Sequence, residues 1–196
     1  MKKTFKIIRD FIVAAAIGAG AMILYLSTRD LLGIEPPGWL AAIAIFTSAL
    51  IISVAVHELG HFAAGKAVGF KFFMLTVGPL KFQRKGDRIE AGLNKHLNIS
   101  GGLTIMIPKT ERYEDSDMFW FILGGPLGNF VLTLVSLAAV LTLEMTTPEF
   151  TGNLTAYILY TTAFASLLIG AAALIPSQSD AFETDGSQLR DLKKRG

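Results

Sequence analysis

The sequence HELGH at residues 57–61 lies near the end of an apolar run that extends from about residue 39 to residue 68. About 20 apolar residues allow a helix to span a bilayer, so the run predicts a membrane helix. Residues four apart share one face of a helix, and the side chains of His57 and His61 would therefore point the same way. Any fold of this chain must accommodate two histidines and a glutamate in a membrane segment, where an unpartnered charge costs about 2.5 kcal/mol or more.

The HExxH pattern supplies the groups of a catalytic zinc site. Two imidazoles on one helix face can bind a single Zn²⁺, and Glu58 lies beside them as a general base for the attacking water. Chance would place the pattern in roughly one such chain in several hundred. The alternative is a pair of polar residues that only pack inside the bundle, but the cost of burying Glu58 in hydrocarbon argues against it. We expect one Zn²⁺ per chain.

The composition is that of a membrane protein, with 52% hydrophobic and 17% charged residues among 196. The net charge of +2 is too small to indicate a nucleic-acid partner. The chain contains no cysteine, which excludes disulfides and thiolate ligands. Any zinc site must therefore use histidine and carboxylate side chains.

Four apolar stretches are long enough to span a bilayer. They cover about residues 11–27, 39–68, 118–143 and 154–175. The first lacks a small-residue cleavage site after it, so we expect a retained anchor and not a signal peptide. We predict a mainly α membrane protein of about four transmembrane helices in a single domain over residues 1–196. Its parts are an accessory span and loop (1–38), the HExxH span (39–69), a β-strand region (70–112), a glycine–proline span (118–144) and a last span with a basic tail (154–196).

Lysine and arginine gather in three segments that flank the apolar stretches: the N-terminus, the connection between the second and third spans, and the C-terminus. Basic flanks remain on the cytoplasmic side of a membrane. We therefore expect both termini and the HExxH end of the second span to face the cytoplasm, most simply across a bacterial cytoplasmic membrane. The oligomeric state is not predicted by this pattern.

The segment from residue 70 to 108 contains scattered glycines and β-prone runs such as residues 72–77, with a turn pattern at 85–87. We predict two to four short strands near the membrane surface. The sheet could be a simple connection. Alternatively, its exposed edge could pair with an unwound substrate near the zinc, since a helical substrate hides its peptide bonds.

A catalytic zinc usually has three protein ligands, so the sequence must supply one more. Asp185 is the first candidate, because it follows the last span and can return to the HExxH side, with Gly186 allowing close backbone approach. As a bare motif, Asp-Gly is also a common turn. Asp180 and Glu183 are nearby rivals. His96, a lone histidine in a basic segment, is a weaker candidate.

The third span contains the cluster GGPLGN at residues 124–129. Glycine and proline inside a membrane helix free backbone groups and permit tight approach, which makes Gly125 and Pro126 candidate substrate contacts. Asn129 is a polar amide in an apolar span. It could hold two helices together through a hydrogen bond, or it could face the zinc and hold a substrate carbonyl or oxyanion.

Taken in order, HELGH at 57–61, GPLGN at 125–129 and TDG at 184–186 resemble the site-2 protease family of intramembrane zinc metallopeptidases. The residues VGP at 77–79 and the pair Gly101-Gly102 are also similar to that family, and the resemblance covers about residues 45–190. It implies His57, His61 and Asp185 as zinc ligands and Glu58 as the general base. It also implies Asn129 as an active-site contact, and Gly101 and Gly102 as substrate-binding positions.

One motif departs from the usual family pattern. The chain has Glu-Thr-Asp-Gly at 183–186, where the family usually carries Asn-Pro-Asp-Gly or a proline-rich relative. No PDZ-like regulatory domain is recognisable, so we expect a minimal core enzyme.

The expected activity is zinc-dependent hydrolysis of a peptide bond in or near a membrane segment. The substrate would be a single-span membrane protein or a hydrophobic peptide precursor. A rival class is a non-hydrolytic zinc-binding membrane protein in peptide export or immunity, which would not need Glu58. A second rival is a zinc-free helical transporter or assembly subunit.

Overall fold

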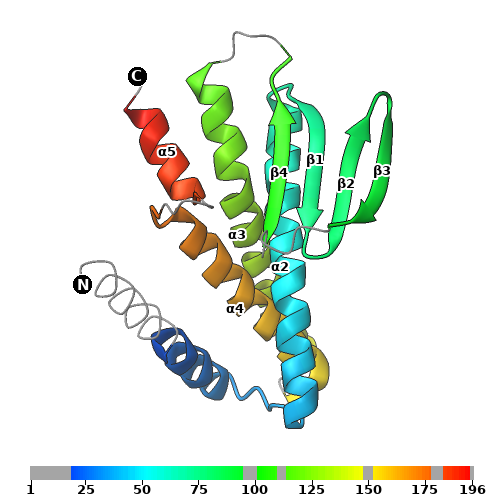
Figure 1. Ribbon diagram of the computed structural model, residues 1–196. Helices are drawn as coiled ribbons and strands as arrows, with labels where there is room; N and C mark the ends of the chain where they lie inside the picture. The colour runs from blue at the N-terminus through cyan, green and yellow to red at the C-terminus, as the bar shows by residue number, and fades with distance from the viewer. Residues whose placement is uncertain (1–18, 95–100, 110–113, 148–151, 178–182, 195–196) are drawn as a thin grey trace, which may run out of the picture.

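The computed structural model describes residues 19–94, 101–109, 114–147, 152–177 and 183–194. A first helix over residues 19–31 is followed by α2 (Trp39–Ala67). Four strands come next: β1 (Lys71–Val77), β2 (Leu80–Lys85), β3 (Arg88–Leu93) and β4 (Gly102–Ile107). The chain continues through α3 (Asp115–Thr146), α4 (Leu154–Leu174) and α5 (Asp185–Lys193). The prediction of a mainly helical protein with a short sheet between the second and third spans is confirmed (Figure 1).

Three of the described helices, α2, α3 and α4, are long and apolar enough to cross a membrane, with 29, 32 and 21 residues. Large apolar side chains remain exposed along them, as Ile43, Leu134 and Val135 illustrate. In a soluble protein such surfaces would be an aggregation hazard, but in a bilayer they face lipid. The protein is therefore a multi-pass integral membrane protein. The expected first span, residues 11–27, lies partly outside the described residues.

Glycines bring α2 and α3 into close contact beside the HExxH sequence. A Cβ added at Gly124 would lie 2.6 Å from the carbonyl oxygen of Gly60, and one at Gly128 would lie 2.9 Å from that of Val56. Neither separation is tolerable for a carbon atom, so only glycine permits this backbone approach. The glycine-rich stretch of α3 therefore sets the distance between the two helices.

The four strands form one antiparallel sheet in the order β3-β2-β1-β4. Both hairpin turns use a glycine with positive φ, 52° at Gly78 and 59° at Gly86, which a side chain would strain. The turn expected at residues 85–87 is confirmed between β2 and β3. One face of the sheet buries Phe72, Leu75 and Met106 against apolar side chains that include some from α2 and α3. Among the described residues β4 pairs only with β1, so its other edge has no strand partner there.

The first helix packs at the opposite end of the bundle from the sheet (Figure 1). Hydroxyl groups join it to α4: the Tyr25 and Thr161 hydroxyls lie 3.0 Å apart, and the Tyr160 hydroxyl donates to the Tyr25 carbonyl at 3.0 Å. After α4 the chain turns, and α5 packs against α3 and α4 near the sheet end. This return brings the start of α5 to the HExxH helix.

Candidate metal centre and active site

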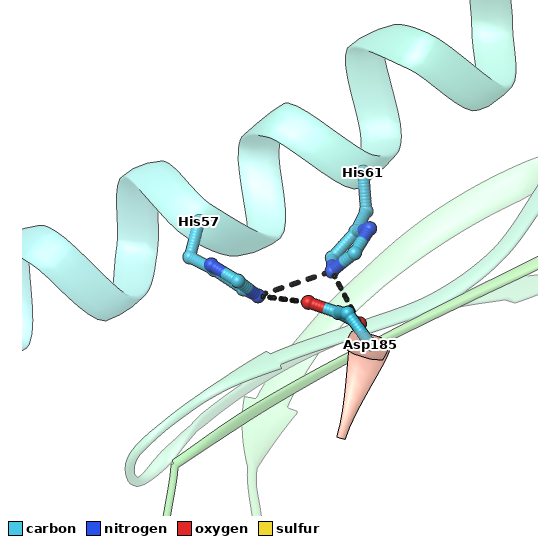
Figure 2. A group of neighbouring side chains, drawn as sticks. All are labelled: His57, His61 and Asp185. Atoms are coloured by element: carbon cyan, nitrogen blue, oxygen red, sulfur yellow. Dashed lines mark hydrogen bonds and ion pairs between the residues drawn. The ribbon is translucent and has the colours of Figure 1, made fainter. Parts of the chain in front are cut away.

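Three buried side chains from two distant parts of the chain converge at one point (Figure 2). His57 and His61 project from one face of α2, and their Nε2 atoms lie 3.1 Å apart. Asp185, at the start of α5, places Oδ2 at 3.0 Å from His57 Nε2 and Oδ1 at 3.5 Å from His61 Nε2. One ligand atom from each residue lies within 4.8 Å of the others, which is the arrangement that a tetrahedral zinc site needs.

The outer nitrogen of each imidazole faces a hydrogen-bond acceptor. His57 Nδ1 lies 2.7 Å from Asn129 Oδ1, and His61 Nδ1 lies 2.9 Å from the carbonyl oxygen of Phe121. An Nδ1–H group donates to each oxygen, so both neutral rings keep a lone pair on Nε2. Metal-ligating histidines typically have such partners, which fix the ring and raise its basicity.

The inner atoms of the three side chains would repel one another without a cation. Two Nε2 lone pairs face each other and a carboxylate, and Asp185 Oδ2 is buried with no hydrogen-bond donor among the described residues. Burying such a group of unsatisfied acceptors costs free energy that a bound cation removes. Two nitrogen ligands and a carboxylate suit Zn²⁺, and the fourth position remains for water or substrate. The residues present therefore fit a zinc ion.

The turn between α4 and α5 positions Asp185. Thr184 caps α5, and its hydroxyl accepts from the Ser177 amide at 2.9 Å and donates to the Ile175 carbonyl at 2.8 Å. A Cβ at Gly186 would collide with the carbonyl group of Leu174, so glycine is required for the close approach of the two helices. The threonine that departs from the usual family motif thus fastens the start of α5 to the end of α4.

Glu58 lies beside the metal group and is held by the sheet. Its side chain is buried, and the Thr104 hydroxyl on β4 approaches Oε2 at 2.6 Å and the Glu58 carbonyl at 3.0 Å. A Cβ at Gly102 would collide with the Glu58 carboxyl group, so β4 can come this close only with glycine at that position. The edge strand and the HExxH helix therefore share one wall of the site.

A cavity of about 350 Å³ opens onto this group, and His57, Glu58, His61 and Asp185 all line it. Other walls come from β4 and the preceding residue, from α3 and α4, and from the start of α5. Its further lining residues include Gly101, Gly102, Thr104, Phe121, Ile122, Ile169, Ala172 and Ala173. Most of these side chains are apolar, as is usual in ligand-binding cavities.

The other candidates of the sequence analysis lie in different places. Glu183 lines the cavity without joining the metal group, while His96 and Asp180 lie outside the described residues. Gly125 packs directly against the histidines, and a Cβ there would lie 2.7 Å from His57 Nε2. Pro126 is buried inside α3, and neither it nor Gly125 lines the cavity.

Asn129 is fully buried and contacts His57 rather than the cavity. Its amide nitrogen donates to the Ser53 carbonyl at 3.0 Å and to Ser166 Oγ at 2.8 Å. These two acceptors fix the amide orientation, so that Oδ1 is the atom that faces His57. Ser166 and Thr104 were not singled out from the sequence. The only signal was a hydroxyl residue within an apolar helix or strand, which is too common to be informative.

A membrane helix bundle with a buried His-His-Asp group and an adjacent glutamate defines the class of membrane-embedded zinc metallopeptidases. Comparison with protein families matches residues 45–189 to peptidase family M50, and the chain belongs to that family. The resemblance to site-2 proteases is confirmed, and with it the assignment as a metallopeptidase. No curated protein and no solved structure matches the chain.

Proposed function

We propose that this protein is a zinc-dependent endopeptidase that hydrolyses a peptide bond in or near a transmembrane segment of its substrate. The observation that carries the proposal is the convergence of His57, His61 and Asp185 with Glu58 in one largely apolar cavity. Binding alone would need the three ligands but not the glutamate. Membership of an intramembrane protease family supports membrane proteins as the substrate class.

Each role in the reaction falls to a group with a suitable position. A zinc ion held by His57, His61 and Asp185 would polarise the scissile carbonyl and lower the pKa of the attacking water. Glu58 would accept the proton of that water and pass it to the leaving amine. Thr104 donates to one carboxylate oxygen of Glu58 and leaves the other for this proton transfer.

We assign Asn129 to orientation of His57 instead of substrate contact. Its amide oxygen engages His57 Nδ1, and both protons of its amide nitrogen have acceptors, so no donor remains for a substrate carbonyl. Gly125 and Pro126 belong to the same scaffold in this proposal, and the substrate contacts fall to Gly101 and Gly102.

The substrate would bind along β4. No other described strand pairs with its outer edge, and its residues Gly102 and Thr104 line the cavity next to Glu58. An extended segment added to that edge would gain backbone hydrogen bonds and expose its peptide bonds to the metal group. A substrate helix must therefore unwind locally, which favours segments that contain glycine or proline.

The distribution of basic residues supports a cytoplasmic active site. The metal ligands of α2 lie in the C-terminal half of the helix, which leads to Lys66 and to the basic sheet region. Both termini would lie on the same side, in keeping with positively charged cytoplasmic flanks. A bacterial cytoplasmic membrane is the location that we propose.

The first experiment is to measure bound zinc per chain in the purified wild type and in His57→Ala, Asp185→Ala and Glu58→Gln. We expect about one zinc ion in the wild type, loss in the two ligand variants, and retention in Glu58→Gln. His96→Ala serves as a histidine control and should retain zinc. A well-folded wild type without zinc would refute the proposal and favour a transporter or assembly subunit.

Hydrolysis is tested with quenched-fluorescent peptides that contain an apolar 20-residue segment with a central glycine–proline pair. The wild type in detergent should cleave them, a zinc chelator should stop cleavage, and Glu58→Gln should be inactive while it still holds zinc. Zinc binding without cleavage of these peptides, or of membrane proteins from the same cells, would instead support a non-hydrolytic binding protein.

A further inference from the structure

A second cavity lies apart from the metal centre, where α2 ends and the sheet begins. It has a volume of about 600 Å³, and none of its lining residues contributes to the active-site cavity. Lys66 in the last turn of α2, Lys71 at the start of β1, Arg84 on β2 and Lys109 after β4 all line it. Four cations from four parts of the chain thus meet at one end of a membrane-spanning helix.

Little within the described chain compensates this positive charge. No acidic residue is among the described residues that line the cavity. Within the described part of the chain, Lys66, Lys71 and Lys109 form no ion pair with any carboxylate. Arg84 has one acidic neighbour, Asp87, at 3.7 Å, but that carboxylate is fully exposed. Such an exposed pair contributes little, so the cavity retains a field that attracts an anion.

The cavity also offers apolar contacts next to the cations. Phe73 and Ile107, which line it from β1 and β4, keep 36% and 47% of their surface exposed. A free phosphate ion would use the cations and leave these side chains in water. A phospholipid would use both, because its headgroup is anionic and its glycerol and acyl region is apolar.

We propose that this cavity binds the headgroup of an anionic phospholipid from the membrane leaflet that surrounds the end of α2. The position is suitable, since residues before Lys66 are apolar enough to lie in hydrocarbon and the cations follow directly. Clusters of lysine and arginine at this depth attract anionic lipids.

A lipid bound there contacts the elements that carry the active site. Lys66 lies five residues beyond His61, about 7.5 Å along the helix axis. Lys71 on β1 is the register partner of Ile107 on β4, and β4 also carries Thr104, which holds Glu58. The bound headgroup therefore joins the end of α2 to the start of β1 and the end of β4, and stabilises the edge strand β4 against the catalytic helix. This effect on the active site rests on the proposed function, whereas lipid binding does not.

The test uses the purified full chain in a neutral detergent, with bound lipid counted by native mass spectrometry. Phosphatidylglycerol and phosphatidylcholine with the same acyl chains are compared. We expect the wild type to prefer phosphatidylglycerol by at least about tenfold, and the triple variant Lys66→Gln/Lys71→Gln/Lys109→Gln to lose this preference. The matched triple variant Lys81→Gln/Lys193→Gln/Lys194→Gln removes the same charge elsewhere and should keep it.

A conservative variant guards against an effect of misfolding. Lys66→Arg/Lys71→Arg/Lys109→Arg retains the charges and should retain the preference, with bound zinc unchanged in all variants. Glycerol phosphate, added at millimolar concentration, should not displace the lipid. The proposal is overturned if the first triple variant keeps the preference, if both glutamine variants lose it equally, or if glycerol phosphate competes fully, which would indicate a soluble phosphate ligand.

Discussion

At the scale of single residues, the amide of Asn129 has the most demanding position. It sits fully buried between α2, α3 and α4 and contacts a backbone carbonyl, a serine hydroxyl and His57 at once. In each contact a hydrogen-bond donor of one partner faces an acceptor of the other. The amide therefore transmits the packing of three helices to the orientation of one metal ligand.

We predict that Asn129→Leu weakens zinc binding about 10- to 100-fold, because His57 loses the acceptor that fixes its ring. Zinc affinity would be measured by competition with a chromogenic chelator. Thr133→Val is the matched control: Thr133 is also buried, one turn along α3, and donates to the carbonyls of Asn129 and Ala163 without touching His57. Equal affinity in Asn129→Leu and the wild type would contradict the assigned role.

Thr104 offers a second prediction at this scale. Thr104→Val removes the hydroxyl that donates to Glu58 but keeps the shape of the side chain. Hydrogen bonds to charged groups contribute about 1.5–3 kcal/mol, so we expect kcat to fall on the order of 10- to 100-fold with bound zinc and KM little changed.

Thr104→Ser restores the hydroxyl and should recover most of the activity. If Thr104→Val loses zinc, or raises KM with kcat unaffected, then Thr104 supports the fold or the substrate and does not position the base.

At the scale of secondary-structure elements, the approach of α2 to α3 determines whether the site can form. The two backbones meet at Gly60 and Gly124, and the next residue, Gly125, leaves room for both imidazoles. A membrane offers no hydrophobic driving force between helices, so association depends on this close fit.

We expect Gly124→Ala to destabilise the protein by about 1–3 kcal/mol, since the added methyl must separate two packed backbones. Its thermal unfolding in detergent should shift to lower temperature, and bound zinc should decrease. Gly20→Ala is the control, because Gly20 is helical and has no atom within 4 Å of an added Cβ. Similar unfolding of both variants would show that the helices can adjust.

At the scale of the whole molecule, the sheet and α5 lie at one end of the bundle and the first helix packs at the other (Figure 1). The sheet carries Lys81, Arg84, Lys85 and Arg88, whereas Arg29 is the one basic residue in the described loops and adjoining helix ends at the opposite end. This asymmetry predicts the orientation in the membrane.

The absence of cysteine makes that orientation measurable, because single cysteines can be introduced freely. Met145, at the end of α3, is 87% exposed and should react as Met145→Cys with an impermeant maleimide added to intact cells. Lys85→Cys and Lys193→Cys should react only after permeabilisation. The reverse pattern would place the active site on the outer side.

Local sequence patterns were sufficient to predict the histidine face of the HExxH helix, the membrane spans and one hairpin. Helical spacing placed His57 and His61 on one face, apolar length identified the spans, and the glycine at 86 marked a hairpin. These inferences succeed because they depend on residues a few positions apart. Its position after the last span and the adjacent Gly186 made Asp185 the first candidate over Asp180 and Glu183, and the family resemblance strengthened that choice.

Contacts between residues far apart in the sequence were decided only by the tertiary structure. The contact between Asp185 and His57 spans 128 positions, and the Thr104–Glu58 contact spans 46. No local period encodes such distances, since they follow from how the helices and the sheet pack. For the same reason the sequence left two roles open for Asn129, whereas packing directs its amide to His57 and to two acceptors on neighbouring helices.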